Sequence, residues 1–423
     1  MTLKNRGPKV LSLAAAAALG AGVLATPAAA TNGYFANGYS VQSKGMAGSG
    51  VAVETGVMGL ANNPALGTRL GRQFDMCASG FNPDRSTTIS PGGPLVPGTF
   101  KSKNPWFLVP CLGVNLPQGD RASLSFMLYG NGGMNTEYTT NFLGFGVGSS
   151  PLGVNLEQLF VSANYAIELD DGLTVGVAPI LAFQRFSATG LEAFGGVTVD
   201  PTSLTGRGDD WSNGFGVNLG VTWEPNEQVT FGASYRSEID MSKFKKYAGL
   251  YANGGDFDIP ATATIGVAVK PASQPGLTVT AELQRIFYGD VPAIANSAAP
   301  PGGPLGSPTG YGFGWVDMDV IRLGAAYQVD NSLTLRAGVS RASDFITNPG
   351  EVIFNTLAPA TPEWHLSFGA TKQLNNGWTL DLAYTHAFDK SYSGANPFMT
   401  GVAQNASIRM DQHEFAFGLS KTW

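Results

Sequence analysis

Two cysteines and three histidines are the residues of this 423-residue chain best suited to chemistry. Cys77 and Cys111 could form a disulfide bond or stay as two buried thiols. His365, His386 and His413 could serve as general bases, but none has a convincing serine and carboxylate neighbourhood, and no Gly-x-Ser-x-Gly elbow occurs. We therefore expect no catalytic site, no cofactor and no metal, and the histidines are interpreted as polar residues of a scaffold.

The first thirty residues predict an export signal rather than part of the fold. A positive stretch comes first, then an apolar stretch, then a small-residue cleavage site: Lys4, Arg6 and Lys9, Val10 to Val23, and Ala28 to Ala30. The apolar stretch is shorter than the ~20 residues that a spanning helix needs, which disfavours a permanent anchor. We expect residues 1–30 to be a signal peptide and the mature chain to start at Thr31.

Composition separates the remaining chain from soluble domains and from helical membrane proteins. Glycine accounts for 56 of 423 residues and charged residues for 13%, against about 25% charged residues in soluble domains. Mean hydropathy is +0.02, as expected when half of each strand faces lipid and half faces water. A net charge of −6 without basic clusters argues against nucleic acid as a partner.

Alternation of apolar with small polar residues predicts long β-strands. In the segment Trp211–Trp223 one face carries Phe215, Val217, Leu219 and Val221, with a tryptophan at each end. A strand of this length, tilted by ~40°, spans about 30 Å and would place both indoles at membrane interfaces. In hydrocarbon every backbone polar group must be paired within the protein. The pattern therefore favours a transmembrane β-barrel over a soluble β-sandwich.

The connections between alternating segments predict the number of strands. Six are short turns with tight-turn residues, near 118–120, 170–172, 224–227, 271–276, 330–331 and 375–377. Seven are long Gly/Pro-rich stretches, near 84–104, 132–154, 190–208, 241–259, 289–314, 344–362 and 391–407. We therefore predict an all-β fold, a 14-stranded antiparallel barrel over residues 72–423. An even strand number puts both barrel ends in the periplasm and the long loops outside.

Residues 31–71 precede the barrel and do not alternate. They combine glycine-rich runs with scattered aromatic residues, whereas disordered tails are richer in charge and poorer in aromatic and branched residues. We expect this segment to form an N-terminal hatch, a plug inside the lumen, where surrounding protein or water makes irregular backbone tolerable at membrane depth. A disordered periplasmic tail is the alternative.

Strand parity places the two cysteines on inward faces of the first two strands. Cys77 shares its face with Asp75 and Ser79, and Cys111 shares its face with Val109. Both lie about seven residues from the loop that joins these strands, so their Cβ atoms could be ~4.5–5.5 Å apart. The prediction is a lumenal disulfide, and two buried thiols are the alternative.

Several motifs of the mature chain resemble those of one known family. They are Lys44–Gly50, Asn63-Pro64-Ala65-Leu66, Phe74, Asn82-Pro83-Asp84, Tyr129-Gly130 with Asn135–Tyr138, Pro225–Gln228 with Ser234–Ser237, and Leu335–Val339. Together they resemble the FadL-type outer-membrane transporters of long-chain fatty acids and aromatic hydrocarbons. The Asn-Pro-Ala element ahead of a 14-stranded barrel is the most specific of these matches.

The resemblance implies a passive route for a hydrophobic small molecule. In such proteins outer loops capture the ligand, an inner pocket binds it, the hatch moves, and the ligand leaves sideways at a kink in the third strand. The kink would fall at Tyr129 and Gly130, because alternation stops there and glycine permits a bend. A strand that simply ends at its loop is the alternative. Asn63, Pro64 and Ala65 would fill the gap beneath the kink.

Ligand-binding positions also follow from the resemblance. Tyr34 and Phe35 would lie in the inner pocket, or pack as ordinary plug residues. Arg185 would hold a carboxylate, since a buried anion must be paired, unless an acidic residue of the lumen satisfies it. The family's second base corresponds to Val316, which leaves a neutral hydrocarbon or aromatic ligand open. The outer groove would use apolar residues of two long loops, unless those loops pack on themselves: Leu191, Phe194, Phe244, Tyr247, Leu250 and Tyr251.

These expectations describe a channel of the bacterial cell outer membrane that takes up fatty acids, hydrocarbons or aromatics and is not an enzyme. A polar-solute porin is the runner-up, and a lipid-acting outer-membrane enzyme is a weaker alternative. The expected partners are the hydrophobic ligand, outer-membrane lipid and lipopolysaccharide, and detergent after purification. The resemblance favours a monomer.

Overall fold

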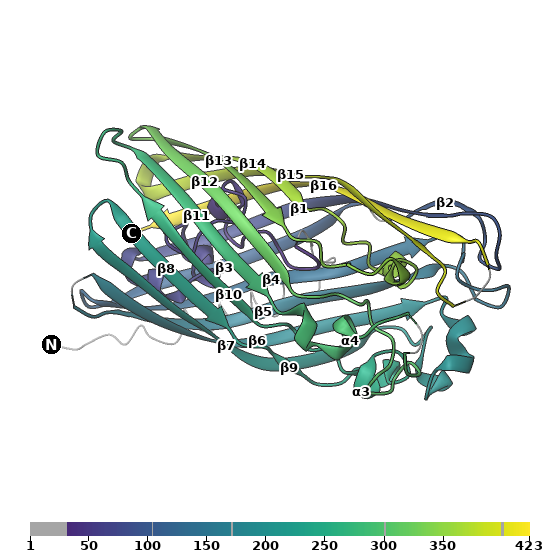
Figure 1. Ribbon diagram of the computed structural model, residues 1–423. Coiled ribbons are helices and arrows are strands. Elements are labelled where there is room, and N and C mark those ends of the chain that lie inside the picture. The colour runs from purple at the N-terminus through teal and green to yellow at the C-terminus, as the bar shows by residue number, and fades with distance from the viewer. Residues whose placement is uncertain (1–31, 104, 171, 300–301, 399–401) are drawn as a thin grey trace.

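A single closed β-sheet dominates the computed structural model, which describes residues 32–103, 105–170, 172–299, 302–398 and 402–423 (Figure 1). The expected signal peptide, residues 1–30, and Thr31 lie outside the described residues. Fourteen antiparallel strands close into a barrel because the last strand pairs with the first. In the described part of the chain no helix is long and apolar enough to cross a membrane.

The barrel strands follow one another in chain order. Their bounds are β1 Gln73–Ile89, β3 Phe107–Gln118, β4 Ala122–Tyr138, β5 Leu152–Glu168, β6 Leu173–Thr189, β7 Asp210–Asn226, β8 Val229–Arg236, β10 Thr262–Val269, β11 Leu277–Ile286, β12 Met318–Asp330, β13 Leu333–Ala342, β14 Trp364–Gln373, β15 Trp378–Ala395 and β16 Asn405–Thr422. Two short strands extend the sheet: β2 Gly98–Lys101 pairs with β1, and β9 Asp240–Met241 pairs with β7. The predicted 14-stranded antiparallel barrel is confirmed.

The barrel wall is uneven in height. Strands β1, β4 to β7, β15 and β16 have 17 or 18 residues, whereas β8, β10, β11, β13 and β14 have 8 to 10. Three predicted loop starts were wrong, because β1 runs to Ile89, β4 to Tyr138 and β15 to Ala395. Glycine, asparagine and proline in these stretches stay in extended, paired backbone, so a composition typical of loops is misleading there.

Helical turns cover the loop end above the short strands, where α3 and α4 lie opposite the end that holds the carboxy terminus (Figure 1). The loop elements are η3 Glu192–Val197, η4 Pro201–Ser203, η5 Lys245–Tyr247, α3 Ala252–Gly255, η6 Tyr288–Asp290, α4 Pro292–Ala295, η7 Pro349–Glu351 and η8 Phe354–Leu357. The short turn Asn375–Gly377 forms η9.

Alternation along the strands separates a lipid-type outer face from a polar inner face. In β7 the outward side chains of Trp211 and Phe215 are 62% and 56% exposed, whereas Asn218 and Thr222 are buried inside. Apolar groups outside and small polar groups inside are the arrangement that a membrane barrel with a filled bore requires.

The amino-terminal segment, residues 32–71, fills the bore at the end where the short turns lie (Figure 1). Its helical turns are α2 Val41–Lys44, η1 Val57–Ala61 and η2 Pro64–Arg69. Glycines of the wall allow close approach: a Cβ at Gly220 would collide with Asn63, and one at Gly232 with the Val51 carbonyl. The segment occupies the position expected for the hatch.

Carboxylates of the wall hold this segment through its backbone and its lysine. Glu282 Oε1 accepts hydrogen bonds from the N–H groups of Gly50 and Val51, both at 2.6 Å. Asp75 Oδ2 accepts from Val57 N at 2.6 Å, and Lys44 Nζ lies 2.7 Å from Glu414 Oε1. Buried charges are tolerated when they are paired and hydrogen-bonded in this way.

Candidate functional site

The ladder between β3 and β4 is interrupted. It ends at the pair Cys111–Tyr129, while β4 continues to Tyr138 against β5. Pairing of β4 with β5 shifts register between Gly130 and Gly132, which marks a β-bulge. Residues Phe107–Pro110 pair with β1, and among the described residues none of these four pairs with a residue of β4. Proline at 110 also lacks the N–H that a ladder needs.

The interruption is bounded at both ends. Its lower end, toward the short turns, is the pair Cys111–Tyr129, and its upper end lies toward the long loops. Lys103 N donates to Glu137 O at 2.8 Å, and Glu137 N donates to Ser102 Oγ at 3.0 Å. Between these contacts and Tyr129, β3 and β4 do not pair over Gly130–Thr136, about 20 Å of strand. We call this interval, Phe107–Pro110 with Gly130–Thr136, the window. Because β4 continues past Gly130, the alternative of a strand that ends at its loop is wrong.

A disulfide bond fixes the lower boundary of the window. Cys77 lies directly opposite Cys111 in the β1–β3 ladder, and the two are bonded. Cys111 is also the first residue of β3, in chain order, that pairs with β4. The lower boundary is therefore held by a covalent bond on one side and by a backbone ladder on the other.

Residues 34–36 of the amino-terminal segment lie behind the bulge of β4. Gly133 N donates to Tyr34 O at 3.0 Å, and Ala36 N donates to Asn131 O at 2.9 Å. Phe35 forms an isolated bridge with Gly132. This stretch, rather than the Asn-Pro-Ala element, fills the space inside the window.

The Asn-Pro-Ala element lies elsewhere, against β5, β6 and β7. Asn63 Nδ2 donates to Val221 O at 3.1 Å, and Asn164 Nδ2 donates to Pro64 O at 3.2 Å. Asn63 Oδ1 caps η2 by accepting from Ala65 N at 3.0 Å. The prediction that Asn63, Pro64 and Ala65 lie beneath the kink is wrong. Gly176 and Gly220 of the wall admit this turn, since an added Cβ would collide with Ala65 N and with Asn63 Oδ1 respectively, and the space behind the bulge of β4 is taken by Tyr34 and Phe35.

A continuous series of aromatic contacts runs from the loop end to the window. Neighbouring ring centroids are 5.1–6.3 Å apart, within the range of favourable ring pairs. The series, here called the aromatic column, runs through Phe398, Phe194, Phe354, Phe313, Trp315, Tyr288 and Phe35. It continues from Phe35 to Arg236, Phe160 and Tyr129. Its last member, Tyr129, borders the window.

Tyr34 and Phe35 are buried at the foot of this column. The Tyr34 ring centroid is 4.9 Å from Phe35, 5.6 Å from Tyr288 and 6.1 Å from Phe257. Tyr288 Oη donates to Asn32 O at 2.6 Å and accepts from Tyr34 N at 3.3 Å. Both residues therefore pack among aromatic side chains, and the Arg236 guanidinium lies 4.8 Å from the Phe35 ring centroid.

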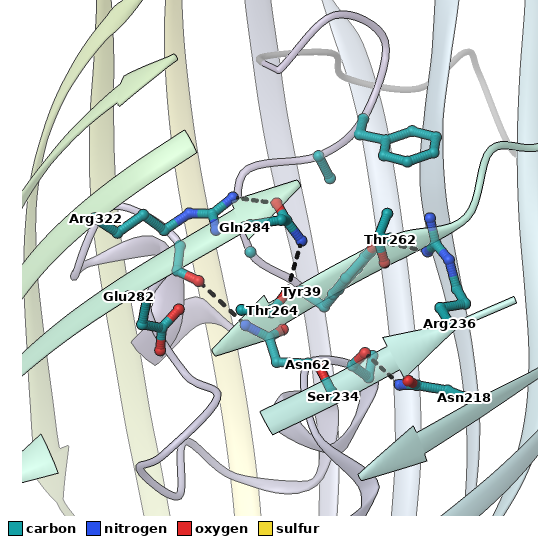
Figure 2. Close-up of a pocket in the computed structure, with 15 residues that line it drawn as sticks. Tyr39, Asn62, Asn218, Ser234, Arg236, Thr262, Thr264, Glu282, Gln284 and Arg322 are labelled. Atoms are coloured by element: carbon teal, nitrogen blue, oxygen red, sulfur yellow. Dashed lines mark hydrogen bonds between the residues drawn. The ribbon is translucent and has the colours of Figure 1, made fainter. Parts of the chain in front are cut away.

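A polar cavity, with Phe35 in its lining, lies between the amino-terminal segment and strands β7 to β12. Figure 2 shows Arg236 and Arg322 entering it from opposite sides. Arg322 Nη2 donates to Gln284 Oε1 at 2.7 Å. The one carboxylate that lines the cavity, Glu282, already accepts two backbone N–H groups.

Arg236 is a buried cation with neutral partners. Its side chain is 5% exposed and lies between the rings of Phe35 and Phe160, 4.8 and 5.4 Å from their centroids. Nη1 donates to Tyr39 Oη and to Asn131 Oδ1 at 3.0 and 2.8 Å. Nε and Nη2 have no hydrogen-bond partner among the described residues. The sequence carried the signal for this residue, because the alternation of Val229–Arg236 places it on the polar face.

Arg185 does not face the lumen. Its guanidinium pairs with Glu157, at 3.0 Å from Nε to Oε2, and with Asp209 at 3.4 Å. It also lies over the outward ring of Trp211. The prediction that Arg185 binds a carboxylate in the inner pocket is wrong, because Leu181, Phe183 and Arg185 share the outward parity of β6. Val316 is likewise 42% exposed and does not line the bore.

The loop residues expected in an outer groove are buried instead. Phe244, Tyr247 and Tyr251 surround Phe186, with centroids 4.8–5.5 Å from its ring. Leu191, Phe194 and Leu250 are also buried, and Phe194 belongs to the aromatic column. The loops pack on themselves, which was the alternative, so the exposed outer groove is not present at these six residues.

The histidines occupy three different environments. His365 is buried with Nδ1 3.2 Å from Ser340 Oγ. His386 and His413 stack on the outer face, with ring centroids 4.7 Å apart. His413 lies within β16, which begins at Asn405. Among the described residues no group of histidine, cysteine and acidic side chains is arranged to hold a metal.

Comparisons with known proteins agree with this architecture. A curated relative, a putative outer membrane protein of Neisseria meningitidis serogroup B, is 24% identical over 246 residues, which span 51% of this chain and 52% of the relative. The match therefore spans about half the length of that relative.

Solved structures share the fold over nearly the whole chain. The Pseudomonas putida toluene transporter TodX is 20% identical, with a TM-score of 0.68 over 93% of this chain and 100% of its own. The Ralstonia pickettii toluene transporter TbuX is 20% identical, with a TM-score of 0.64 over 92% and 99%. A Pseudomonas aeruginosa FadL homologue is 15% identical, with a TM-score of 0.68 over 92% and 99%.

A family model extends the likeness from fold to family. The model described as outer membrane protein transport protein (OMPP1/FadL/TodX) matches residues 22–420. The chain belongs to this family, whose members are transport channels of the bacterial outer membrane rather than enzymes.

Proposed function

We propose that this protein passes a hydrophobic small molecule passively across the outer membrane, from its loops to the window between β3 and β4. The observation that carries the proposal is the aromatic column, which begins at Phe398 in the loops and ends at Tyr129 beside the window. A hydrophobic solute avoids bulk water because exposing apolar surface costs about 25 cal/mol per Å². Between Phe398 and Phe35 the ring faces offer such a solute apolar surface, and the Arg236 guanidinium separates Phe35 from Phe160.

Exit through the window fits the filled bore. The amino-terminal segment acts as the hatch and blocks the axial path, with α2, η1 and η2 packed against the wall. The window lies at the foot of the column and opens toward membrane lipid, the partner of the outer wall. Rings of the column are in mutual contact, so passage requires the loops and residues 32–39 to move aside. The proposal describes a monomer, since one barrel contains the whole route.

The ligand class is an aromatic or similarly compact hydrophobic compound. TodX and TbuX are toluene transporters, and the ring faces of the column suit a π-rich ligand.

One observation favours a second candidate, a hydrophobic acid such as a long-chain fatty acid. Arg236 is buried with neutral partners at the foot of the column, and a carboxylate would pair its unused N–H groups.

Narrowing the window tests the proposed route. A Cβ at Gly130 would lie 2.8 Å from Val109 Cγ1, so Gly130→Val fills the space between β3 and β4. We expect uptake of labelled toluene and labelled oleate to fall by about tenfold, since an added barrier of only about 1.4 kcal/mol slows a step that much.

The matched control is Gly196→Val in the loop, where an added Cβ meets nothing within 4 Å. Heat-modifiable migration of the folded barrel shows whether each variant folds. Normal uptake by folded Gly130→Val protein would reject exit through the window. Large single-channel conductance in the unmodified protein would instead favour the polar-solute porin.

A further inference from the structure

We propose that Arg85 acts as a bar across the window. Its guanidinium reaches from β1 to β4, and its hydrogen bond to β4 must break before a ligand leaves. This inference rests on the proposed function, because it assigns a gate to the same exit. Arg85 lies on the inward face of β1, is 5% exposed and pairs with Met410 of β16 in the ladder.

The contacts of Arg85 bridge the window at its upper end. Nη1 donates to the backbone carbonyl of Asn135 in β4, and Nη2 donates to Lys103 O at 3.3 Å. The guanidinium carbon also lies 5.2 Å from the ring centroid of Phe107, a β3 residue of the window. One side chain from β1 thus connects three sides of the opening, where β3 and β4 have no ladder.

The two ends of the window are closed by bonds of different kinds. At the lower end Cys111 is bonded to Cys77 and laddered to Tyr129, so movement there breaks a disulfide or several backbone bonds. At the upper end two hydrogen bonds, from Lys103 N to Glu137 O and from Glu137 N to Ser102 Oγ, lie beyond the window, and rotation of the Arg85 side chain removes the link to Asn135 below them. A side-chain rotation is a smaller change than separation of a ladder, so the part of the window beside Arg85 is the part that opens.

An apolar cavity lies immediately behind Arg85. Most of its lining is apolar or backbone: Gly33, Phe81, Pro83, Phe107, Gly133, Met134, Ala358, Pro359, Ala360 and Met410, with Arg85 and Asn135 as the polar members. Gly33 adjoins Tyr34, so this cavity continues from the foot of the aromatic column. A hydrophobic ligand held there contacts Arg85 and Asn135, the polar residues of the lining, beside the interval where β3 and β4 do not pair.

Replacing the bar with a side chain of similar length tests the proposal. Arg85→Met keeps the apolar stem over Phe107 and removes the donors to Asn135 and Lys103. We expect the initial rate of toluene uptake to rise by about tenfold, the factor that loss of one charge-assisted hydrogen bond from a barrier gives. Arg341→Met is the matched control, because Arg341 also lies over a ring, that of Trp364, but on the outer wall.

A structural measurement accompanies the uptake assay. Amide hydrogen exchange of residues 133–137 in Arg85→Met should speed up about tenfold, while residues 122–129, which are laddered to β3, stay unchanged. Faster exchange with unchanged or slower uptake would overturn the bar, because Arg85 would then support β4 without gating. Unchanged exchange would overturn it as well.

A double variant separates this inference from the proposed route. If the ligand leaves by the window, Gly130→Val must cancel the gain of Arg85→Met. A gain that persists in the double variant means that the ligand leaks elsewhere, which overturns the bar. Failure of the route itself shows independently, as normal uptake in the single variant Gly130→Val.

Discussion

The two parts of the amino-terminal segment are held in different ways. Residues 40–71 are fixed by wall carboxylates, with Glu282 on two backbone N–H groups, Asp75 on a third and Glu414 on Lys44. Residues 32–36 are held by neutral hydrogen bonds to Tyr288 and to the bulge of β4, whereas Arg322 Nε and Arg236 Nη1 donate to Asn37 Oδ1 and Tyr39 Oη at 3.4 and 3.0 Å. Hydrogen bonds to charged groups contribute about 1.5–3 kcal/mol and neutral ones about 0.5–1.5 kcal/mol. We therefore expect a ligand to displace residues 32–36 first.

The largest effect in this comparison is expected at the buried pair Lys44–Glu414. Lys44→Met leaves Glu414 charged and unpaired in the lumen, which should lower the free energy of unfolding by about 3–5 kcal/mol. Glu414→Leu should cost about as much, while the double variant should lose far less, because neither charge remains buried alone. Denaturant unfolding in detergent micelles measures all three. Additive losses in the double variant would show that the pair is not what holds α2.

An intermediate effect is expected at Tyr288, which holds residues 32–36 through Asn32 and Tyr34. Tyr288→Phe removes the donor to Asn32 O and the acceptor for Tyr34 N. These are neutral bonds, so amide exchange of residues 32–37 should speed up by roughly tenfold, while residues 41–61 keep their protection. Tyr327→Phe, on the outer face of β12, is the matched control. Equal acceleration of both parts would break the comparison.

Strand parity explains which features of this protein are predictable from sequence. Alternation of apolar and polar residues gave the 14 strands and the facing positions of Cys77 and Cys111, because side-chain direction in a strand has a period of two. The same rule, applied to Leu181 and Phe183, places Arg185 on the outer wall. The family resemblance pointed to the opposite face, and the local parity was the better guide.

Contacts between distant segments explain what was not predictable. Phe244 is buried because Phe186, far away in the chain, lies 5.5 Å from it, and no local pattern announces such a pairing. Arg85 is not predictable as a residue of the wall because the glycine and proline residues after it are typical of a loop, although β1 continues to Ile89. The place of the Asn-Pro-Ala element depends on Gly176 and Gly220, which admit it only once β6 and β7 are side by side.

Asp258 offers a finer test of residues 32–36, through the contact between Phe257 and Tyr34. It lies in the connection between β9 and β10, next to Phe257, whose ring is 6.1 Å from that of Tyr34. Burial raises the pKa of Asp258 to about 7, the N–H of Met241 opposes this, and the charges of Asp256, Glu238 and Asp240 add to it.

The direction of the pH effect follows from that raised pKa. A carboxyl group whose folded pKa exceeds its unfolded value binds its proton more tightly in the folded state. Its contribution to the stability of the folded state is therefore complete below about pH 4. This contribution declines as pH rises toward 7 and is lost above pH 7. Amide exchange of residues 256–259 and 32–36, corrected for intrinsic rates, should therefore be slower at pH 5 than at pH 8. Asp258→Asn should remove the difference at both sites, and a difference that survives at residues 32–36 would mean that the Phe257 contact does not transmit it.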